Sequence, residues 1–303
     1  MKYILSIILS LIVTFTKAQQ LTLSEYLVNS TIKIETTEYS ANSKQKYLSF
    51  SGTGFFFVFT VGKMEIPVIV TNKHVIKNAE KGTLYFKTMK ADSTPNYTNI
   101  EKMEFEKFGQ KWILHPDTTV DLAILPIGTY LNAYSRYGKT LYFKAYGEDM
   151  IPNDSIRNSL LAIEDILMIG YPFGLRDIKN DIPIVRKGIT ATPPYLDYNL
   201  NKEFLIDMAV FPGSSGSPVM IYNPTSYTSR KGNLYMGSRL ILLGINYATY
   251  TRDFEGKITA KTAFEPPSKF KTSTAIPYNI GIIIKAERLL DFKPLLVRLL
   301  LKR

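Results

Sequence analysis

The sequence Phe-Pro-Gly-Ser-Ser-Gly-Ser-Pro occupies residues 211–218 and separates two runs, 204–208 and 217–222, whose composition predicts strands. Its glycines allow a tight backbone that can present consecutive N–H groups to one point, as a nucleophilic serine requires. Among the three serines, only Ser215 has glycine two residues before it, glycine directly after it and proline three residues after it. A plain turn between strands would also suit this segment, so other parts of the sequence are needed to distinguish a nucleophile from a turn.

A serine hydroxyl is a weak nucleophile that needs a base beside it, and the chain contains only two histidines. His74 follows an apolar strand predicted over residues 67–71 and lies among small and polar residues, which favours a place at the edge of a cleft. His115 precedes a proline in a polar loop, and we expect it to be exposed on the surface. Since a lone histidine is usually structural, His74 becomes a candidate base only in combination with Ser215.

A catalytic histidine also needs a buried carboxylate that fixes its tautomer. Asp121 opens the apolar run 121–126, where an acid is costly unless it has a partner. Asp117 competes for this role, but it lies in an irregular polar turn. We therefore predict Asp121 as the acid.

Most of the chain reads as short strands rich in β-branched and aromatic residues, with 20 Tyr and 17 Phe in total. None is followed by the long amphipathic helix that a parallel sheet requires, so we expect an all-β protein of antiparallel barrels or a sandwich. The polar stretch 128–163 is the candidate interdomain connection. Residues 286–301 show helical spacing, with Pro294 expected to kink or divide the helix. The predicted strands are 31–35, 54–60, 67–71, 83–87, 121–126, 166–170, 204–208, 217–222 and 240–247.

The first eighteen residues predict export. Lys2 precedes an apolar run, residues 4–15, and small residues ending at Ala18 follow at the spacing of a signal peptidase site. The run is shorter than the ~20 residues of a spanning helix, although an uncleaved anchor is the alternative. We expect a signal peptide over residues 1–18, a periplasmic or secreted mature chain, and no stable membrane insertion.

The net charge bears on the class of partner, and the cysteine content bears on disulfides and metal sites. The formal charge is +11, and removal of Lys2 and Lys17 leaves 11 − 2 = +9, which raises the alternative of a polyanion-binding surface. The lysines are scattered among acids, as over residues 102–107, so we expect a solvated surface and no nucleic-acid partner. The absence of cysteine excludes disulfides and thiolate metal sites.

Three stretches extend the pattern beyond the triad residues themselves: residues 71–76, which surround His74, and residues 169–175 and 243–246. In this order the segments resemble the chymotrypsin-like serine peptidases. The similarity is greatest to the bacterial cysteine-free members, notably the high-temperature-requirement proteases, and residues 214–219 also resemble the glutamyl endopeptidases. The similarity runs from about residue 51 to residue 284, and the residues that follow are too few for a PDZ domain, so we expect none of the kind that the high-temperature-requirement proteases carry.

The resemblance implies two six-stranded antiparallel barrels within a peptidase domain over residues 19–285. The first barrel would span about 28–130 and the second about 160–285, with a C-terminal helix over 286–303. His74 and Asp121 would come from the first barrel and Ser215 from the second, and the backbone N–H groups of Gly213 and Ser215 would form an oxyanion hole. No cofactor or metal is implied.

The resemblance also indicates a specificity pocket. Its floor would lie six residues before the nucleophile, at Ala209, which offers no carboxylate to a basic side chain. Glutamyl endopeptidases place a histidine where this chain has Asn246, so a preference for Glu is not expected either. A neutral pocket bounded by Ala209, Ile245 and Tyr247 would suit small or medium aliphatic residues.

Two departures from the family accompany these motifs. The usual Gly-Gly-Pro after the nucleophile is Gly-Ser-Pro at residues 216–218, as in the glutamyl branch, and Ser214 stands where the digestive enzymes have an aspartate. We expect a secreted serine endopeptidase that acts on protein or peptide substrates. The alternative is a catalytically inactive trypsin-like module that binds a peptide or protein partner in the same cleft.

Overall fold

The computed structural model describes residues 21–39, 47–257 and 271–301. The predicted signal peptide, residues 1–18, lies outside these ranges. Among the helices that the described residues form, none is both long and apolar enough to cross a membrane.

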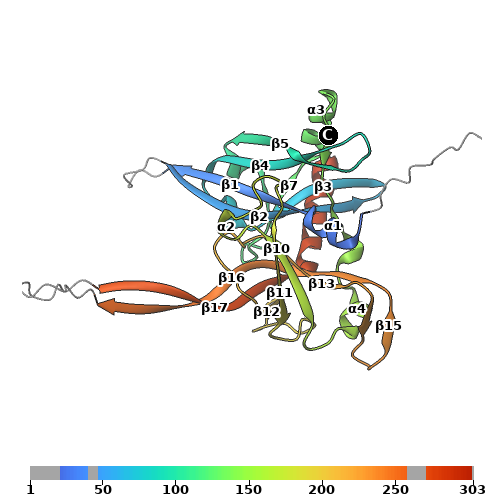
Figure 1. The fold of residues 1–303 in the computed structure, drawn as a ribbon, viewed down its shortest axis with the longest axis vertical. Coiled ribbons are helices and arrows are strands. Elements are labelled where there is room, and N and C mark those ends of the chain that lie inside the picture. The colour runs from blue at the N-terminus through green and yellow to red at the C-terminus, as the bar shows by residue number, and fades with distance from the viewer. Residues whose placement is uncertain (1–20, 40–46, 258–270, 302–303) are drawn as a thin grey trace, which may run out of the picture.

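Nine strands in the first half of the chain form one sheet, in which seven strands follow the order β5-β4-β1-β2-β3-β7-β6 (Figure 1). Strand β8 pairs with β4, and β9 runs parallel to β2. Helix α1 (Leu23–Val28) precedes the sheet and begins with a capping box between Thr22 and Glu25. The strands are β1 (Thr31–Tyr39), β2 (Tyr47–Val61), β3 (Met64–Thr71), β4 (Ala79–Met89), β5 (Pro95–Glu106), β6 (Ile113–Leu114), β7 (Ala123–Pro126), β8 (Leu141–Tyr142) and β9 (Tyr146–Gly147).

The second half forms a closed barrel of six strands in the order β10-β11-β12-β17-β16-β13. A small hairpin of β14 (Ser226–Thr228) and β15 (Leu234–Met236) lies outside it. Beyond the barrel, β16 and β17 continue as a two-stranded ribbon that projects from the body (Figure 1). The barrel strands are β10 (Asp165–Gly170), β11 (Ile184–Thr190), β12 (Glu203–Asp207), β13 (Pro218–Asn223), β16 (Arg239–Lys257) and β17 (Lys271–Lys285).

Strand β2 lies where the sheet meets the barrel, and its aromatic run explains this position. Phe55, Phe57 and Phe59 are fully buried in a core that includes Ile245 of the barrel. Phe56 points the other way and packs in the separate core of the sheet. Because side chains alternate along a strand, consecutive aromatic residues predict a strand buried on both faces.

The all-β class with a C-terminal helix is confirmed, and two details differ from the expectation. The first unit is a nine-stranded sheet, whereas we expected a six-stranded barrel. The stretch 128–163 is no simple connection, because it contributes β8 and β9 to that sheet. It also contains α3 (Gly128–Arg136), the 3₁₀ turn η2 (Glu148–Met150) and α4 (Asp154–Ser159).

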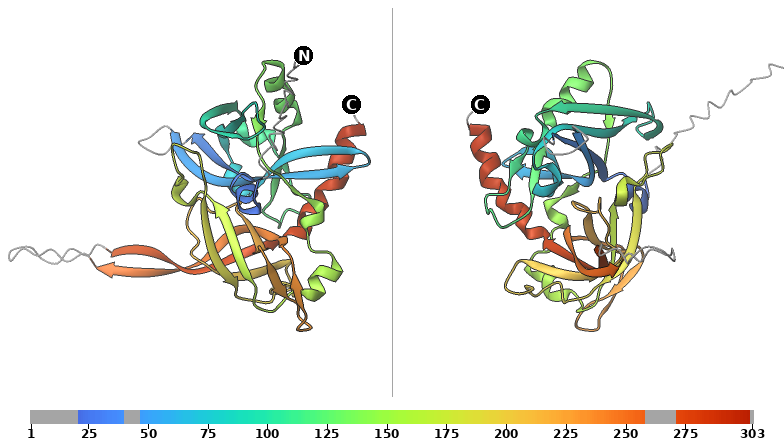
Figure 2. Two further views of the ribbon diagram at one scale, coloured as in Figure 1. Left: turned by 45° about the vertical axis from the view of Figure 1, so that its right-hand side comes forward. Right: turned by 90° about the vertical axis from the view of Figure 1, so that its left-hand side faces the viewer.

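The C-terminal segment consists of the 3₁₀ helix η4 (Ala286–Phe292) and helix α5 (Lys293–Leu301). Pro294 stands in the first turn of α5, where its missing N–H leaves no bond unmade, so the helix is divided at this point. The segment, drawn in red in Figure 2, runs from the barrel along the side of the sheet. Leu289, Phe292 and Leu296 are buried in the core that both units share.

Candidate active site

His74 and Asp121 are in direct contact at one end of the sheet. His74 lies in the short helix α2 (Lys73–Ile76), which follows β3, and Asp121 precedes β7, the strand paired with β3. The His74 Nδ1 atom is 2.5 Å from Asp121 Oδ2, and the His74 backbone N–H donates to Asp121 Oδ1 at 3.1 Å. Asp121 thus holds both the ring and the backbone of the histidine, which leaves Nε2 as the ring nitrogen available to a reaction.

Asp117, the competing acid, is occupied elsewhere. Its Oδ1 accepts from the backbone N–H of Thr119 at 2.9 Å and from the Thr119 hydroxyl at 2.6 Å. Its Oδ2 accepts from Arg288 at 2.8 Å. The bonds from Thr119, together with the Arg288 guanidinium, lower the pKa of the Asp117 carboxyl to about 2.

The expectation that His115 is exposed is wrong. Its side chain is 0% exposed and packs edge-on against the Phe292 ring, with 5.1 Å between ring centroids. The polar residues after His115 suggested a surface loop, but the C-terminal segment covers this part of the loop. His115 therefore belongs to the structural contacts beside the site.

The nucleophile segment contains a tight turn. The Ser214 N–H donates to the Phe211 carbonyl at 2.9 Å, with Pro212 and Gly213 between them. Gly213 has φ +90°, a region that favours glycine, and proline followed by such a residue is typical of a type II β-turn. Ser215 follows this turn directly and is half-buried.

Thr53 of β2 fastens the nucleophile segment to the sheet. Its N–H donates to the Ser215 carbonyl at 2.9 Å, and its hydroxyl donates to the Gly213 carbonyl at 2.8 Å. The Thr53 carbonyl in turn accepts from the Thr71 hydroxyl at 2.7 Å. Thr71 ends β3 three residues before His74, so a continuous chain of hydrogen bonds joins the backbone of Ser215 to the strand that leads into His74.

Two backbone N–H groups of the nucleophile segment have no partner in the part of the chain that the structure describes. Within the described residues, neither Gly213 nor Ser215 donates its N–H to another protein atom. The Phe173 N–H donates to the Pro212 carbonyl at 2.6 Å, and the carbonyl and N–H of one trans peptide point in opposite directions. The Gly213 N–H therefore points away from Phe173. Unpaired donors on a half-buried loop suit an oxyanion.

Of the residues predicted for the specificity pocket, Asn246 contacts the nucleophile segment through its side chain. Asn246 is fully buried, and its Nδ2 donates to the Ser214 carbonyl at 3.1 Å. Ile245 is buried in the shared core, and the Tyr247 hydroxyl donates to a glutamate of β12. Ala209 is half-buried after that strand. The pocket itself stays a prediction.

Two surface grooves border the site. One, of about 740 Å³, is lined by His74, Asp121 and residues of α2 and of η1 (Phe108–Lys111). The other, of about 580 Å³, is lined by Pro212, Gly213 and residues of β1 and β4. The first groove thus reaches the imidazole and the second reaches the glycine turn.

Sequence reasoning missed Thr53 and Phe173. Thr53 lies between two glycines of a strand, a signal of close backbone approach. At Gly54, an added Cβ would lie 2.7 Å from the Ile69 side chain. Phe173 lies in the motif 169–175, but no local pattern connects its N–H with Pro212.

A family model described as a trypsin-like peptidase domain matches residues 52–223, which is more than half of the chain. The matched region contains Thr53, His74, Asp121 and Ser215. None of the curated proteins matches the chain.

Proposed function

The chain belongs to the family of trypsin-like peptidase domains, and from this premise we propose that it is an exported serine endopeptidase. Ser215 is the nucleophile, His74 the base and Asp121 the acid of the triad. The observation that carries the proposal is the pairing of His74 Nδ1 with Asp121 Oδ2, together with the N–H groups of Gly213 and Ser215, which donate to no atom of the described residues. The signal-like residues 1–18 support export to the periplasm or the medium.

Each group has one task in the reaction. Ser215 Oγ attacks the peptide carbonyl carbon while His74 Nε2 takes the hydroxyl proton. Asp121 keeps the proton on Nδ1 and stabilises the imidazolium, and the N–H groups of Gly213 and Ser215 bind the oxyanion. The imidazolium then protonates the leaving amine. A water molecule, deprotonated by His74, hydrolyses the acyl-enzyme and restores the Ser215 hydroxyl.

A fluorophosphonate probe tests the assignment, because it reacts with an activated serine. We expect the mature chain to be labelled at Ser215, as located by mass spectrometry, and the label to disappear in His74→Ala. Ser215→Ala should lower turnover by roughly 10⁴ to 10⁶. Ser217→Ala is the matched control, because the buried Ser217 Oγ has no partner among the described residues, and it should be much milder.

A chain that resists the probe and cleaves no protein substrate, while its thermal unfolding is cooperative, would contradict the proposal. That result would favour the alternative of a trypsin-like module that only binds a peptide or protein partner.

A further inference from the structure

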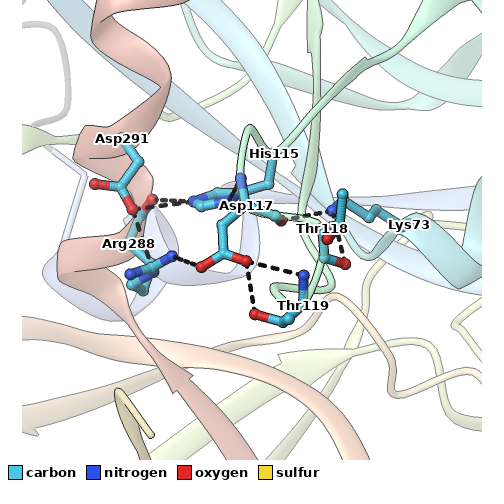
Figure 3. A network of polar contacts seen from close by, with 7 residues as sticks. All are labelled: Lys73, His115, Asp117, Thr118, Thr119, Arg288 and Asp291. Atoms are coloured by element: carbon cyan, nitrogen blue, oxygen red, sulfur yellow. Dashed lines mark hydrogen bonds and ion pairs between the residues drawn. The ribbon is translucent and has the colours of Figure 1, made fainter.

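The loop that carries Asp121 contacts two other parts of the molecule (Figure 3). Residues 115–122 connect β6 to β7, and Asp117 closes a local turn within the loop by accepting two bonds from Thr119. This turn fixes the middle of the loop. The end of the loop, beside Asp121, is held by the bond from the His115 N–H to the Leu122 carbonyl at 2.9 Å and by the contacts that hold the turn.

The start of α2 holds the loop on one side. Lys73 Nζ donates to the Asp117 carbonyl at 2.9 Å, and its distance to the Thr118 carbonyl is 3.5 Å. Asn72 Nδ2 donates to the Asp121 carbonyl at 2.7 Å. Because Asn72 and Lys73 directly precede His74, these bonds set the loop relative to the proposed base.

Arg288 of η4 holds the loop on the other side (Figure 3). One guanidinium nitrogen donates to Asp117 Oδ2 at 2.8 Å, and Nε lies 3.2 Å from Asp291 Oδ2. The contact with Asp117 is a directed hydrogen bond, whereas the contact of Nε with Asp291 is an ion pair without hydrogen-bond geometry. Arg288 thus joins the turn to the C-terminal segment through its bond to Asp117.

His115 supplies a second connection between the same two parts. Its Nδ1 accepts from the Asp117 N–H at 3.1 Å, and its Nε2 lies 3.1 Å from the Arg288 carbonyl and 3.2 Å from Asp291 Oδ2. The Nδ1 atom also lies 3.3 Å from the Asp117 carbonyl oxygen. The fully buried ring therefore fixes the start of the loop against η4.

We propose that Arg288 and His115 are positioning residues, through which the C-terminal segment sets the placement of Asp121 against His74. This inference rests on the proposed function. Among the described residues, no hydrogen bond or ion pair joins Arg288 to the proposed triad, and Arg288 acts through Asp117, four residues before Asp121. Catalysis is sensitive to such placement, since a shift of about 1 Å can cost roughly a hundredfold in rate. The C-terminal segment is thereby part of what determines turnover.

Steady-state kinetics with matched variants test the proposal. Arg288→Gln should lower kcat about tenfold with little change in KM, because substrate contacts remain while the triad is displaced. Arg288→Lys keeps the charge and should recover part of the loss. Lys293→Gln is the control. Lys293 lies in the same C-terminal segment as Arg288 but pairs with Glu148 of η2, at 2.8 Å, and not with the loop. The kcat of this variant should stay within about twofold of the wild type.

A spectroscopic readout separates positioning from a general structural role. The proton shared between His74 Nδ1 and Asp121 should give a low-field NMR signal, which should shift or broaden in Arg288→Gln and stay unchanged in Lys293→Gln. This signal does not require turnover, so it tests the positioning even if the chain fails to react with the probe. An unchanged signal together with an unchanged kcat in Arg288→Gln would overturn the proposal.

A double-mutant cycle tests whether Arg288 acts on Asp121 through Asp117. If Arg288 acts through Asp117, the double variant Arg288→Gln with Asp117→Asn should lose no more activity than the worse single variant. Losses that multiply would overturn this path. All variants are compared below their unfolding midpoints, with the folded fraction measured by circular dichroism.

Discussion

The backbone N–H of Phe173 donates to the carbonyl oxygen of Pro212 across 2.6 Å. Phe173 adopts φ +51°, which is uncommon for a residue with a side chain. Its ring packs against Phe211 at 5.3 Å between centroids, beside the same turn. The contact fixes the Pro212–Gly213 peptide so that the Gly213 N–H points away from Phe173. The orientation of one proposed oxyanion donor thus depends on a residue forty positions earlier.

Substitution of Phe173 tests this dependence. Phe173→Pro removes the N–H and forces φ near −65°, so the Pro212 carbonyl loses its partner and the peptide can rotate. We expect kcat to fall by about 10² or more, the loss typical of one missing oxyanion donor. Phe173→Gly keeps the N–H, accepts the positive φ and loses only the ring, so it should retain most of the activity. Equal losses in the two variants would assign the effect to ring packing.

Gly213 itself allows a second test by steady-state kinetics. An added Cβ would lie 2.5 Å from the Tyr171 carbonyl oxygen and 2.9 Å from the Phe173 nitrogen, at a φ that disfavours any side chain. Gly213→Ala should therefore displace the turn and lower kcat by about 10² to 10³. Gly232→Ala is the matched control, because Gly232 has a similar φ of +81° with nothing within 4 Å of the added Cβ. If both variants keep wild-type kcat, the turn is not part of the active site.

Local patterns in the sequence predicted the all-β class and selected His74 and Asp121, which lie in contact. Those predictions rest on residue types and spacing, which are local properties. The Thr53 contact with Gly213 spans 160 positions and the His115 contact with Arg288 spans 173, so no window of sequence contains both partners. His115 was misplaced for this reason, since its loop looks polar until the C-terminal segment covers it.

The amide variant of Asp121 tests the proposed acid. The two carboxylate oxygens of Asp121 accept from the His74 ring and from the His74 backbone. An asparagine has one acceptor oxygen, so its NH₂ group would face one of two donors and favour the wrong imidazole tautomer. Asp121→Asn should lower kcat by about 10⁴. Asp117→Asn should show only the smaller positioning loss, and a larger loss there would make Asp117 the acid.

Acid titration of stability tests the Asp117 contacts. The pKa of Asp117 is lowered from 3.8 to about 2, so the folded state holds its proton less tightly than the unfolded state. The stabilisation is therefore fully present above about pH 4 and is lost as the pH falls towards 2. Asp117→Asn keeps an acceptor for Thr119 but cannot ionise, so its Tm should lie below that of the wild type at pH 6. The gap should narrow between pH 4 and 2, and a constant gap would contradict the charged pairing.

Cleavage specificity is the last prediction. At the proposed pocket, Ala209 has no charge, and Asn246 is a neutral amide whose Nδ2 donates to the Ser214 carbonyl, so neither offers a charge to pair with a substrate side chain. We expect a peptide library to be cleaved after small or medium aliphatic residues, with broad preference, because a methylene in an apolar pocket is worth only about 1 to 3 kcal/mol. Predominant cleavage after Arg, Lys or Glu would contradict the neutral pocket.

The variant Ala209→Asp tests whether residue 209 forms the floor of the pocket. A carboxylate there would need a cationic partner and should shift cleavage towards Arg and Lys. If this variant folds and cleaves with the wild-type preference, Ala209 does not line the pocket.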